Sequence, residues 1–168
     1  SEFSHATTIH TTKSSTVPTS KDPLTEWYWE GNIQNQIALY LKSNGWNIEH
    51  LSDTASNERG IDIRARNEDQ MLLVEVKGYP SNRYYRGPKK GQLKPTPPTL
   101  QARHWFAGAL LSALLLKNQY PQSKIALGLP DVQRYRSLLK KTGDSLIKLN
   151  LTVYLVSSEG KVITFIDS

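Results

Sequence analysis

The sequence predicts an α/β fold in which helices flank a mixed central β-sheet. Three observations lead to this prediction: a helical stripe near the start of the chain, two further helical stretches, and short apolar runs of strand length between and after them. The expected order is helix, three strands, helix, strand, helix and a final pair of strands. With 168 residues, 38% of them hydrophobic, the chain is expected to bury one core as one domain.

The first predicted helix lies within residues 24–45. Its apolar side chains recur at helical spacing and Asn44-Gly45 is a typical helix end. The stripe consists of Trp29, Ile33, Ile37, Tyr40 and Leu41. A short strand is expected at 46–52 and a loop at 53–60. A hairpin follows, with strands 61–66 and 71–77 joined by the four residues 67–70.

The second half of the chain repeats helix and strand signals. Thr99 is expected to cap a helix over 100–117, and Asp131 a helix over 132–141. The continuous apolar run 124–129 predicts a strand covered on both faces. A short helix around 145–149 and a hairpin of strands 151–156 and 162–166 complete the domain, which is expected to span 24–168. Residues 1–23, rich in Ser and Thr and without periodicity, are expected to be a flexible tail or linker.

Composition excludes several classes of protein. The chain has no cysteine, which rules out disulfides, thiolate metal sites and cysteine nucleophiles and agrees with a cytoplasmic location. Any metal must therefore be held by oxygen or histidine. The apolar run 105–116 is too short to cross a membrane, so it is interpreted as a core helix and no membrane partner is expected.

The first hairpin carries charges inside its strands. Alternation places Ile61, Ile63 and Ala65 on one face and charged residues on the other. If Arg66 pairs with Met71, Asp62 lies opposite Glu75, with Cβ atoms roughly 5 Å apart. Like charges at that distance favour a divalent cation held by carboxylates and a substrate phosphate, with Lys77 placed to hold an attacking water. The alternative is a solvated salt-bridge face.

A second acid-x-lysine triplet tests how specific this signal is. Glu159-Gly160-Lys161 lies in a turn signal with no paired acid in a facing strand. The triplet at Glu75 instead ends an apolar run and has Asp62 upstream, after a glycine. Only the first hairpin is therefore predicted to be a catalytic site.

Positive charge is concentrated after that hairpin. No acid occurs between Glu75 and Asp131, and the loop at 79–99 interleaves Tyr84 and Tyr85 with five basic residues. Basic side chains that contact phosphates, together with aromatic rings that stack on nucleobases, are typical of a nucleic-acid-binding surface. The predicted nucleic-acid-binding residues are Arg83, Tyr84, Tyr85, Arg86, Lys89, Lys90, Lys94 and Arg103. The alternative is a solubilising loop.

The motif resembles the PD-(D/E)xK nuclease superfamily, closest to Mrr-type restriction endonucleases and Holliday-junction resolvases. The resemblance covers residues 27–130 and rests on Gly60-Ile61-Asp62, Glu75-Val76-Lys77 and the helix that ends before Trp46. It implies a restriction-endonuclease-like sheet. It also implies Mg²⁺, or Mn²⁺ in its place, held by Asp62, Glu75 and the carbonyl of Val76, with Lys77 orienting or activating the water.

The resemblance also implies an acid on the first helix. The family spacing points to Gln34, whereas Glu30, one turn earlier, is the better candidate to touch metal-bound water. A favourable interaction of Glu30 with the helix dipole is the alternative. Gln101, at the start of the helix after the loop, is expected to make an outer contact with the site.

These observations predict a metal-dependent DNA endonuclease that hydrolyses phosphodiester bonds. Two alternatives stay open. One is a DNA-binding module with a vestigial nuclease site. The other is a nuclease subunit active only within a larger restriction, repair or recombination assembly, with a homodimer or a larger nucleoprotein assembly as the working form. RNA is disfavoured, because no single-strand-binding signal beyond Tyr84 and Tyr85 is present.

Overall fold

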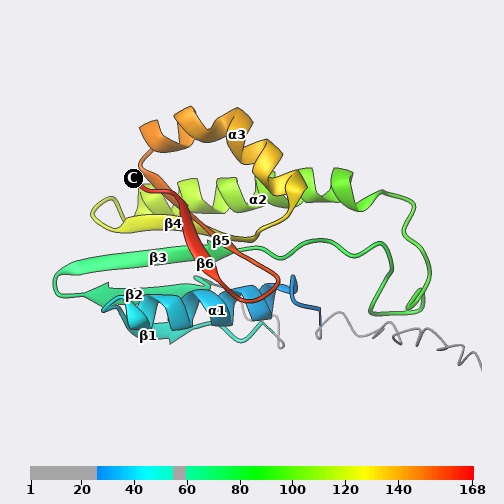
Figure 1. Cartoon of the computed structure of the whole chain (residues 1–168), viewed down its shortest axis with the longest axis horizontal. Coiled ribbons are helices and arrows are strands. Elements are labelled where there is room, and N and C mark those ends of the chain that lie inside the picture. Colours follow the sequence, from blue (N-terminus) through cyan, green and yellow to red (C-terminus); the bar gives the residue numbers. More distant parts are fainter. Residues whose placement is uncertain (1–25, 55–59) are drawn as a thin grey trace, which may run out of the picture.

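The structure is a computed structural model that describes residues 26–54 and 60–168, so the tail expected at 1–23 lies outside the described residues. Three helices and six strands form within those ranges (Figure 1). In chain order they are α1 (Glu30–Ser43), β1 (Asn47–Leu51), β2 (Ile63–Asn67), β3 (Gln70–Val76), α2 (Pro98–Gln119), β4 (Lys124–Pro130), α3 (Gln133–Lys148), β5 (Leu151–Val156) and β6 (Val162–Ile166).

The six strands form one mixed sheet in sequential order, β1 to β6. β1, β2 and β3 pair antiparallel, β3, β4 and β5 pair parallel, and β6 returns antiparallel to β5. The two parallel pairs need crossover connections, and α2 and α3 provide them. The predicted mixed α/β sheet flanked by helices is confirmed.

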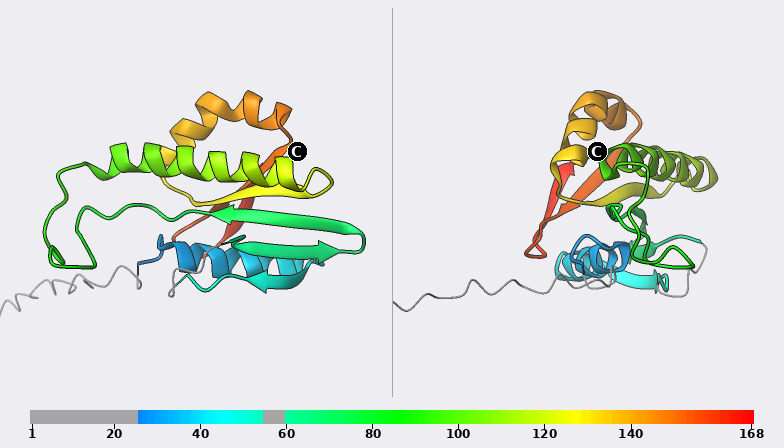
Figure 2. Two further views of the ribbon diagram at one scale, coloured as in Figure 1. Left: turned by 180° about the vertical axis from the view of Figure 1, so that it is seen from behind. Right: turned by 90° about the vertical axis from the view of Figure 1, so that its right-hand side faces the viewer.

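Helices cover both faces of the sheet (Figures 1 and 2). α1 packs through Ile33 and Ile37 on one face, and α2 and α3 cover the other. Alternation along β3 divides its side chains accordingly, because Val74 and Val76 belong to the α1 core while Leu73 belongs to the core under α2 and α3. Glu75 therefore shares the face of Leu73, as predicted.

Several predicted boundaries are wrong. α1 begins at Glu30, not within 24–29, and Trp29 precedes it with extended backbone. α2 begins at Pro98, because proline suits a first helical turn whose N–H groups lack partners, and Thr99 is therefore not its cap. Asp131 does not cap α3 either, since its carboxylate forms an ion pair with Arg136.

The first hairpin and α3 also differ from expectation. Asn67 pairs with Gln70, so the connection is a two-residue turn, which Glu68 makes possible with its left-handed backbone (φ 52°). The predicted pairing of Arg66 with Met71 is correct. α3 runs as one helix from Gln133 to Lys148, not as two pieces, because Leu139 and Leu146 bury the same apolar stripe in the core.

Three chain segments converge at one end of the molecule. The carboxyl end of β3, the amino end of α1 and the amino end of α2 all lie toward the right in Figure 1. Clefts of α/β sheets characteristically form outside the carboxyl ends of the parallel strands.

Among the described residues, no helix combines the length and the apolar character that crossing a membrane requires.

Candidate functional site

Four charged side chains gather where β3 ends, and we call them the acid cluster: Glu30, Asp62, Glu75 and Lys77. Glu75 is the penultimate residue of β3 and Asp62 directly precedes β2. Glu30 is the first residue of α1, and its Oε1 lies 4.0 Å from Nζ of Lys77. Of the two sequence candidates on the first helix, Glu30 lies beside the lysine of the motif, and its role stays a prediction.

Backbone and side-chain contacts fix the position of Asp62. Its Oδ2 accepts a hydrogen bond from the N–H of Val76 at 2.7 Å, and its carbonyl accepts one from the N–H of Ser52 at 2.9 Å. The β2–β3 ladder ends at Ile63, one pair before the predicted pairing of Asp62 with Glu75. A side-chain oxygen thus takes the place of the next rung and holds the carboxylate against the end of β3.

Because the β2–β3 pairing stops before Asp62, the side chain of Ile61 also lies on a different face from the one predicted. Ile61 was predicted to share a face with Ile63 and Ala65, which lie in the α1 core. Instead it packs against the core under α2 and α3. Strand alternation does not extend past the point where Asp62 replaces the backbone pairing.

Gln34 supports Asp62 through Ser52. Gln34 is 2% exposed, and its Nε2 donates to the carbonyl of Ser52 at 2.7 Å. The hydroxyl of Ser52 lies 3.3 Å from both Oε1 of Gln34 and Oδ1 of Asp62. Gln34 is thus one residue removed from the acid cluster. Ser52 could not be identified from the sequence, because an isolated serine after a strand has no distinctive spacing.

Replacing Ser52 by alanine is expected to lower the free energy of unfolding by about 1–3 kcal/mol, since the buried Oε1 of Gln34 loses its hydroxyl partner. Denaturant unfolding measures this loss. Ser43→Ala is the matched control, because it removes an exposed hydrogen bond to the carbonyl of Tyr40 and should cost within about 0.5 kcal/mol. Equal effects of the two substitutions would contradict the supporting role of Ser52.

Burial dominates the electrostatics of the acid cluster. It raises the pKa of Glu75 to about 8, with the charge of Asp62 adding to the shift and Lys77 opposing it. Burial also raises the pKa of Asp62, against the hydrogen bonds from Val76 and Ser52, and that of Glu30, against Lys77. The predicted repulsion between the two acids therefore acts on Glu75, but as the second cause after burial.

Gly78 holds the motif against α1. A Cβ on Gly78 would lie 2.6 Å from the carbonyl oxygen of Tyr28 and 2.7 Å from the nitrogen of Glu30, so no larger residue fits. The next N–H, of Tyr79, donates to the carbonyl of Tyr28 at 3.0 Å. The buried hydroxyl of Tyr135 donates to the carbonyl of Gly78 at 2.7 Å. This close contact is what keeps Glu30 beside Lys77.

The oxygen donors of the acid cluster suit a hard cation. Within residues 26–54 and 60–168, no three side chains of the His, Cys, Asp and Glu types are grouped so as to hold a metal ion. The ligand set expected from the sequence is smaller, with two carboxylates and the carbonyl of Val76. Such a set matches Mg²⁺, which keeps several waters and is typically bound by one or two carboxylates and a substrate phosphate.

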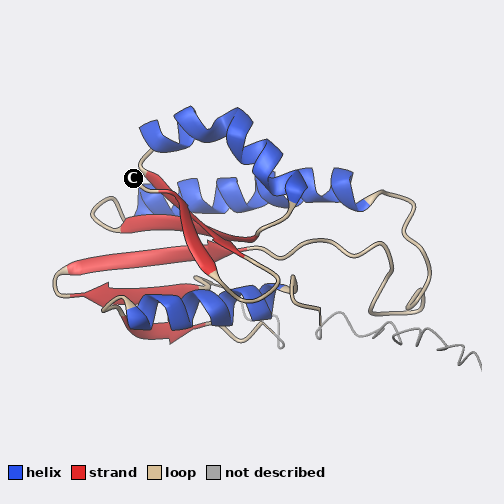
Figure 3. Ribbon diagram, viewed as in Figure 1, coloured by secondary structure: helices blue, strands red, loops and turns tan. Residues whose placement is uncertain are grey.

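The basic loop, residues 79–97, connects β3 to α2 and extends beyond the sheet (Figure 3). Arg83 and Leu93 form an isolated antiparallel bridge, and Nη1 of Arg83 donates to the carbonyl of Gly91 at 2.8 Å. The loop is thus folded back on itself. Its expected nucleic-acid-binding residues Arg83, Tyr85, Arg86, Lys89 and Lys90 are exposed, as is Arg103 on α2.

Tyr84 and Lys94 of the basic loop lie close together, and Lys94 contacts Gln101 on α2. The ammonium groups of Lys89 and Lys94 lie 5.8 Å and 5.9 Å from the ring centre of Tyr84. Gln101 accepts from Nζ of Lys94 at 3.4 Å and donates to the carbonyl of Thr96 at 2.9 Å. These two hydrogen bonds direct Gln101 to the loop, where it ties the loop end to α2.

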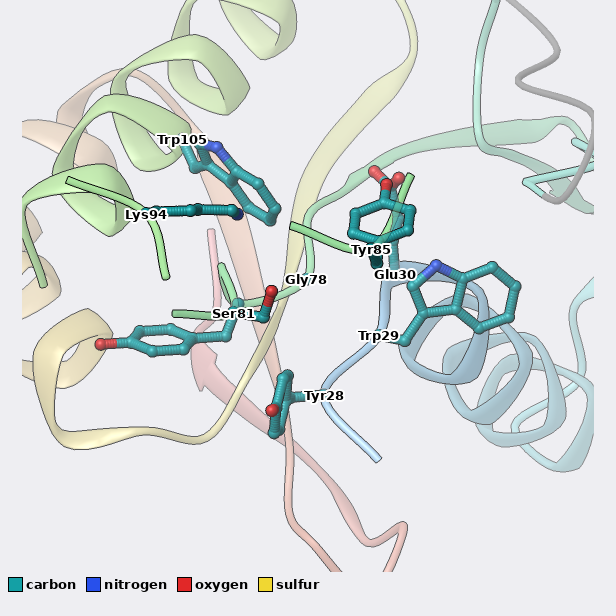
Figure 4. Close-up of a pocket in the computed structure, with 9 residues that line it drawn as sticks. Tyr28, Trp29, Glu30, Gly78, Ser81, Tyr85, Lys94 and Trp105 are labelled. Atoms are coloured by element: carbon teal, nitrogen blue, oxygen red, sulfur yellow. The ribbon is translucent and has the colours of Figure 1, made fainter. Parts of the chain in front are cut away.

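A hollow separates the acid cluster from the basic loop (Figure 4). We call it the aromatic hollow. Its lining residues are Tyr28, Trp29, Glu30, Gly78, Tyr79, Ser81, Tyr85, Lys94 and Trp105. They come from the chain before α1, the start of α1, the residue just before the basic loop, the loop itself and α2, so no sequence pattern could have grouped them.

Two solved structures resemble this chain at low identity. The XisH family protein from Nostoc punctiforme PCC 73102 is 15% identical, with a TM-score of 0.45 over 80% of this chain and 98% of that chain. The fdxN element excision controlling factor protein from Anabaena variabilis is 16% identical, with a TM-score of 0.43 over 78% and 95%. No family model and no curated protein match the chain. Both likenesses are too distant to transfer a role to this chain.

Proposed function

We propose that the protein is a metal-dependent deoxyribonuclease of the PD-(D/E)xK type, which hydrolyses DNA phosphodiester bonds with Mg²⁺ or Mn²⁺. The observation that supports this most strongly is the acid cluster itself. Two half-buried carboxylates, Asp62 and Glu75, lie beside Lys77 at the carboxyl end of a central strand. In the structural ion pair of Asp131 with Arg136 the arginine lowers the pKa of the acid, whereas burial raises the pKa of all three acids here.

Each residue of the acid cluster has a defined part in this mechanism. Asp62, Glu75 and the carbonyl of Val76 would hold the divalent cation. When bound, the cation supplies Lewis-acid stabilisation of the phosphoryl group and a nucleophilic water at neutral pH. Lys77 positions that water and offsets the negative charge that develops on the phosphoryl oxygens. Glu30, whose Oε1 lies 4.0 Å from Nζ of Lys77, places a negative charge beside the ammonium group.

Charge favours DNA as the substrate. The chain carries a net charge of +6, and the interval from Val76 to Pro130 contains bases but no acid. The exposed basic residues of the loop begin at Arg83, six residues after Lys77, and can contact phosphates on either side of the scissile bond. We propose that this loop supplies most of the DNA affinity and that the acid cluster supplies the chemistry. The protein would act alone, as a homodimer or within a larger nucleoprotein assembly.

Incubation of the protein with supercoiled, linear, branched and single-stranded DNA tests the proposal. Cleavage is expected with Mg²⁺ or Mn²⁺ and should stop completely when EDTA removes the metal. Gel electrophoresis resolves the nicked and linear products. DNA that is bound but never cut with either metal would contradict the enzymatic function.

One observation favours a second candidate, a DNA-binding module without hydrolysis. The acid cluster offers only two carboxylates to a cation, because Glu30 lies against Lys77. With few protein ligands, metal affinity depends on the phosphate of bound DNA. Calorimetric titration of Mn²⁺ into the protein–DNA complex separates the two candidates, since the binding module requires no metal there.

A further inference from the structure

The aromatic hollow adjoins the acid cluster and has the chemistry of a base-stacking site. Its cavity volume is about 70 Å³, roughly half of a cavity that encloses benzene, so the hollow can receive the edge of a flat ring but not enclose a whole base. In Figure 4, Trp105 and Lys94 border it on one side and Trp29, Tyr85 and Glu30 on the other. Flat rings with a cation at the rim suit a flat aromatic ligand that is attached to a phosphate.

The position of the hollow relates that ligand to the acid cluster. Glu30 lines the hollow and also lies 4.0 Å from Nζ of Lys77. Gly78, which directly follows Lys77 in the sequence, also lines the hollow. A nucleotide whose base enters the hollow would therefore have its phosphate close to the acid cluster.

A second hollow continues in the direction of the basic loop. It is lined by Tyr84, Tyr85, Arg86, Lys94, Pro95, Thr96, Gln101 and Trp105. Three of these residues, Tyr85, Lys94 and Trp105, also line the aromatic hollow, so the two hollows adjoin. Aromatic side chains beside basic side chains are typical of a groove that binds single-stranded nucleic acid. In such a groove the nucleobases stack on the aromatic rings and the phosphates contact the cations.

The three shared residues have contacts with the surrounding structure. Nζ of Lys94 lies 3.4 Å from Oε1 of Gln101 and 5.9 Å from the ring centre of Tyr84, while its N–H donates to the carbonyl of Asn82 at 2.8 Å. Tyr85, which is 38% exposed, has the guanidinium of Arg86 5.3 Å from its ring centre. Trp105 lies on α2, one residue before the core residue Phe106. Lys94 is therefore held against α2 through Gln101, and Trp105 is part of α2 itself.

We propose that the aromatic hollow binds an unpaired nucleobase next to the scissile phosphate, so that the substrate is DNA with an unpaired nucleotide at the cleavage point. This inference rests on the proposed nuclease function, because it takes the acid cluster as the place of cleavage. A base inside a regular duplex stacks on its neighbours and cannot enter the hollow without being extruded. Single-stranded ends, flaps and branch points present such a base without that cost.

The test measures binding in EDTA, so that it requires no hydrolysis. Two DNA duplexes with a single-stranded flap are compared, one carrying the fluorescent base 2-aminopurine and one an abasic site at the first unpaired position. A fully paired duplex with 2-aminopurine is the third ligand. Base stacking in the hollow should make the 2-aminopurine flap bind about 5- to 150-fold more tightly than the abasic flap, with quenched fluorescence.

Variants on α2 assign the effect to the hollow. Trp105→Ala should abolish the preference for the base-containing flap, and Trp105→Phe, which keeps a ring, should restore most of it. Leu115→Ala is the matched control on the same helix, since Leu115 is 61% exposed and lies outside the hollow. Equal affinity of the unaltered protein for the 2-aminopurine and abasic flaps, or a preference that survives in Trp105→Ala, would overturn the inference.

The outcomes also separate this inference from the nuclease proposal. A base preference lost in Trp105→Ala, together with no cleavage in any metal, would support the hollow and refute the nuclease. Metal-dependent cleavage of fully paired DNA without any base preference would support the nuclease and refute the hollow.

Discussion

Replacing Lys77 by alanine is expected to slow DNA cleavage by about 10²- to 10⁴-fold, the usual contribution of a positioned catalytic side chain. Nζ of Lys77 lies in the acid cluster, 4.0 Å from Glu30, and no other base follows β3 directly. DNA affinity should fall by less than about tenfold, because the five bases of the loop remain. Single-turnover cleavage rates and binding titrations measure the two effects separately.

The chain supplies its own control for this experiment. Lys161 belongs to the second acid-x-lysine triplet, in the exposed turn where Ser157 donates its N–H to the carbonyl of Lys161. Lys161→Ala removes the same charge from the same short motif outside the acid cluster, and its cleavage rate should stay within about twofold of the parent. If Lys77→Ala and Lys161→Ala cleave equally fast, the acid cluster is not the catalytic site.

Replacing Glu75 by glutamine is expected to stabilise the metal-free protein at alkaline pH. Burial raises the pKa of Glu75 from its ordinary 4.5 to about 8, so the folded state favours the protonated form. The stabilising contribution of that proton is present below about pH 4.5 and is lost as the pH rises through 8. Between about pH 4.5 and pH 8, the free energy of unfolding falls by about 1.4 kcal/mol for each pH unit. Glutamine keeps the shape and avoids the buried charge.

Melting curves in EDTA at pH 5 and pH 9 measure this difference. The melting temperature of Glu75→Gln should exceed that of the parent at pH 9 and differ little from it at pH 5. Each kcal/mol of difference in the free energy of unfolding should shift the melting temperature by about 2–4 °C. Mg²⁺ or Mn²⁺ should raise the melting temperature of the parent more than that of the variant, since it binds the folded acid pair. Glu159→Gln, in the exposed turn, is the control. An advantage of Glu75→Gln that is equal at both pH values would contradict the buried charge.

Local pairing made the first hairpin predictable. Arg66 and Met71 pair as the sequence indicated, because a short turn leaves few alternative registers, and this brought Asp62 and Glu75 to one end of the sheet. The mixed sheet followed from strand-length apolar runs separated by helices. Periodicity alone placed Trp29 in the helix, whereas its ring in fact packs against Gly31, within 2.4 Å of where a Cβ would lie.

Contacts between distant segments were beyond the reach of the sequence. The link from Gln34 through Ser52 to Asp62 joins α1, the end of β1 and the start of β2, and none of these residues has a distinctive spacing. The aromatic hollow likewise depends on how the basic loop folds back toward α1. Choosing between Glu30 and Gln34 also required the structure, since both lie on the first helix, one turn apart.

The hydrogen bond from Tyr135 to Gly78 bears on the order in which the domain can be completed. It spans 57 residues and is formed by a helix that is synthesised well after every member of the acid cluster. A ribosome adds about 5–20 residues per second, so several seconds separate the appearance of Lys77 from that of Tyr135. During that interval the nascent chain carries all four charged residues without the tyrosine that holds Gly78. The supported acid cluster is thus available only to a chain whose synthesis has passed α3.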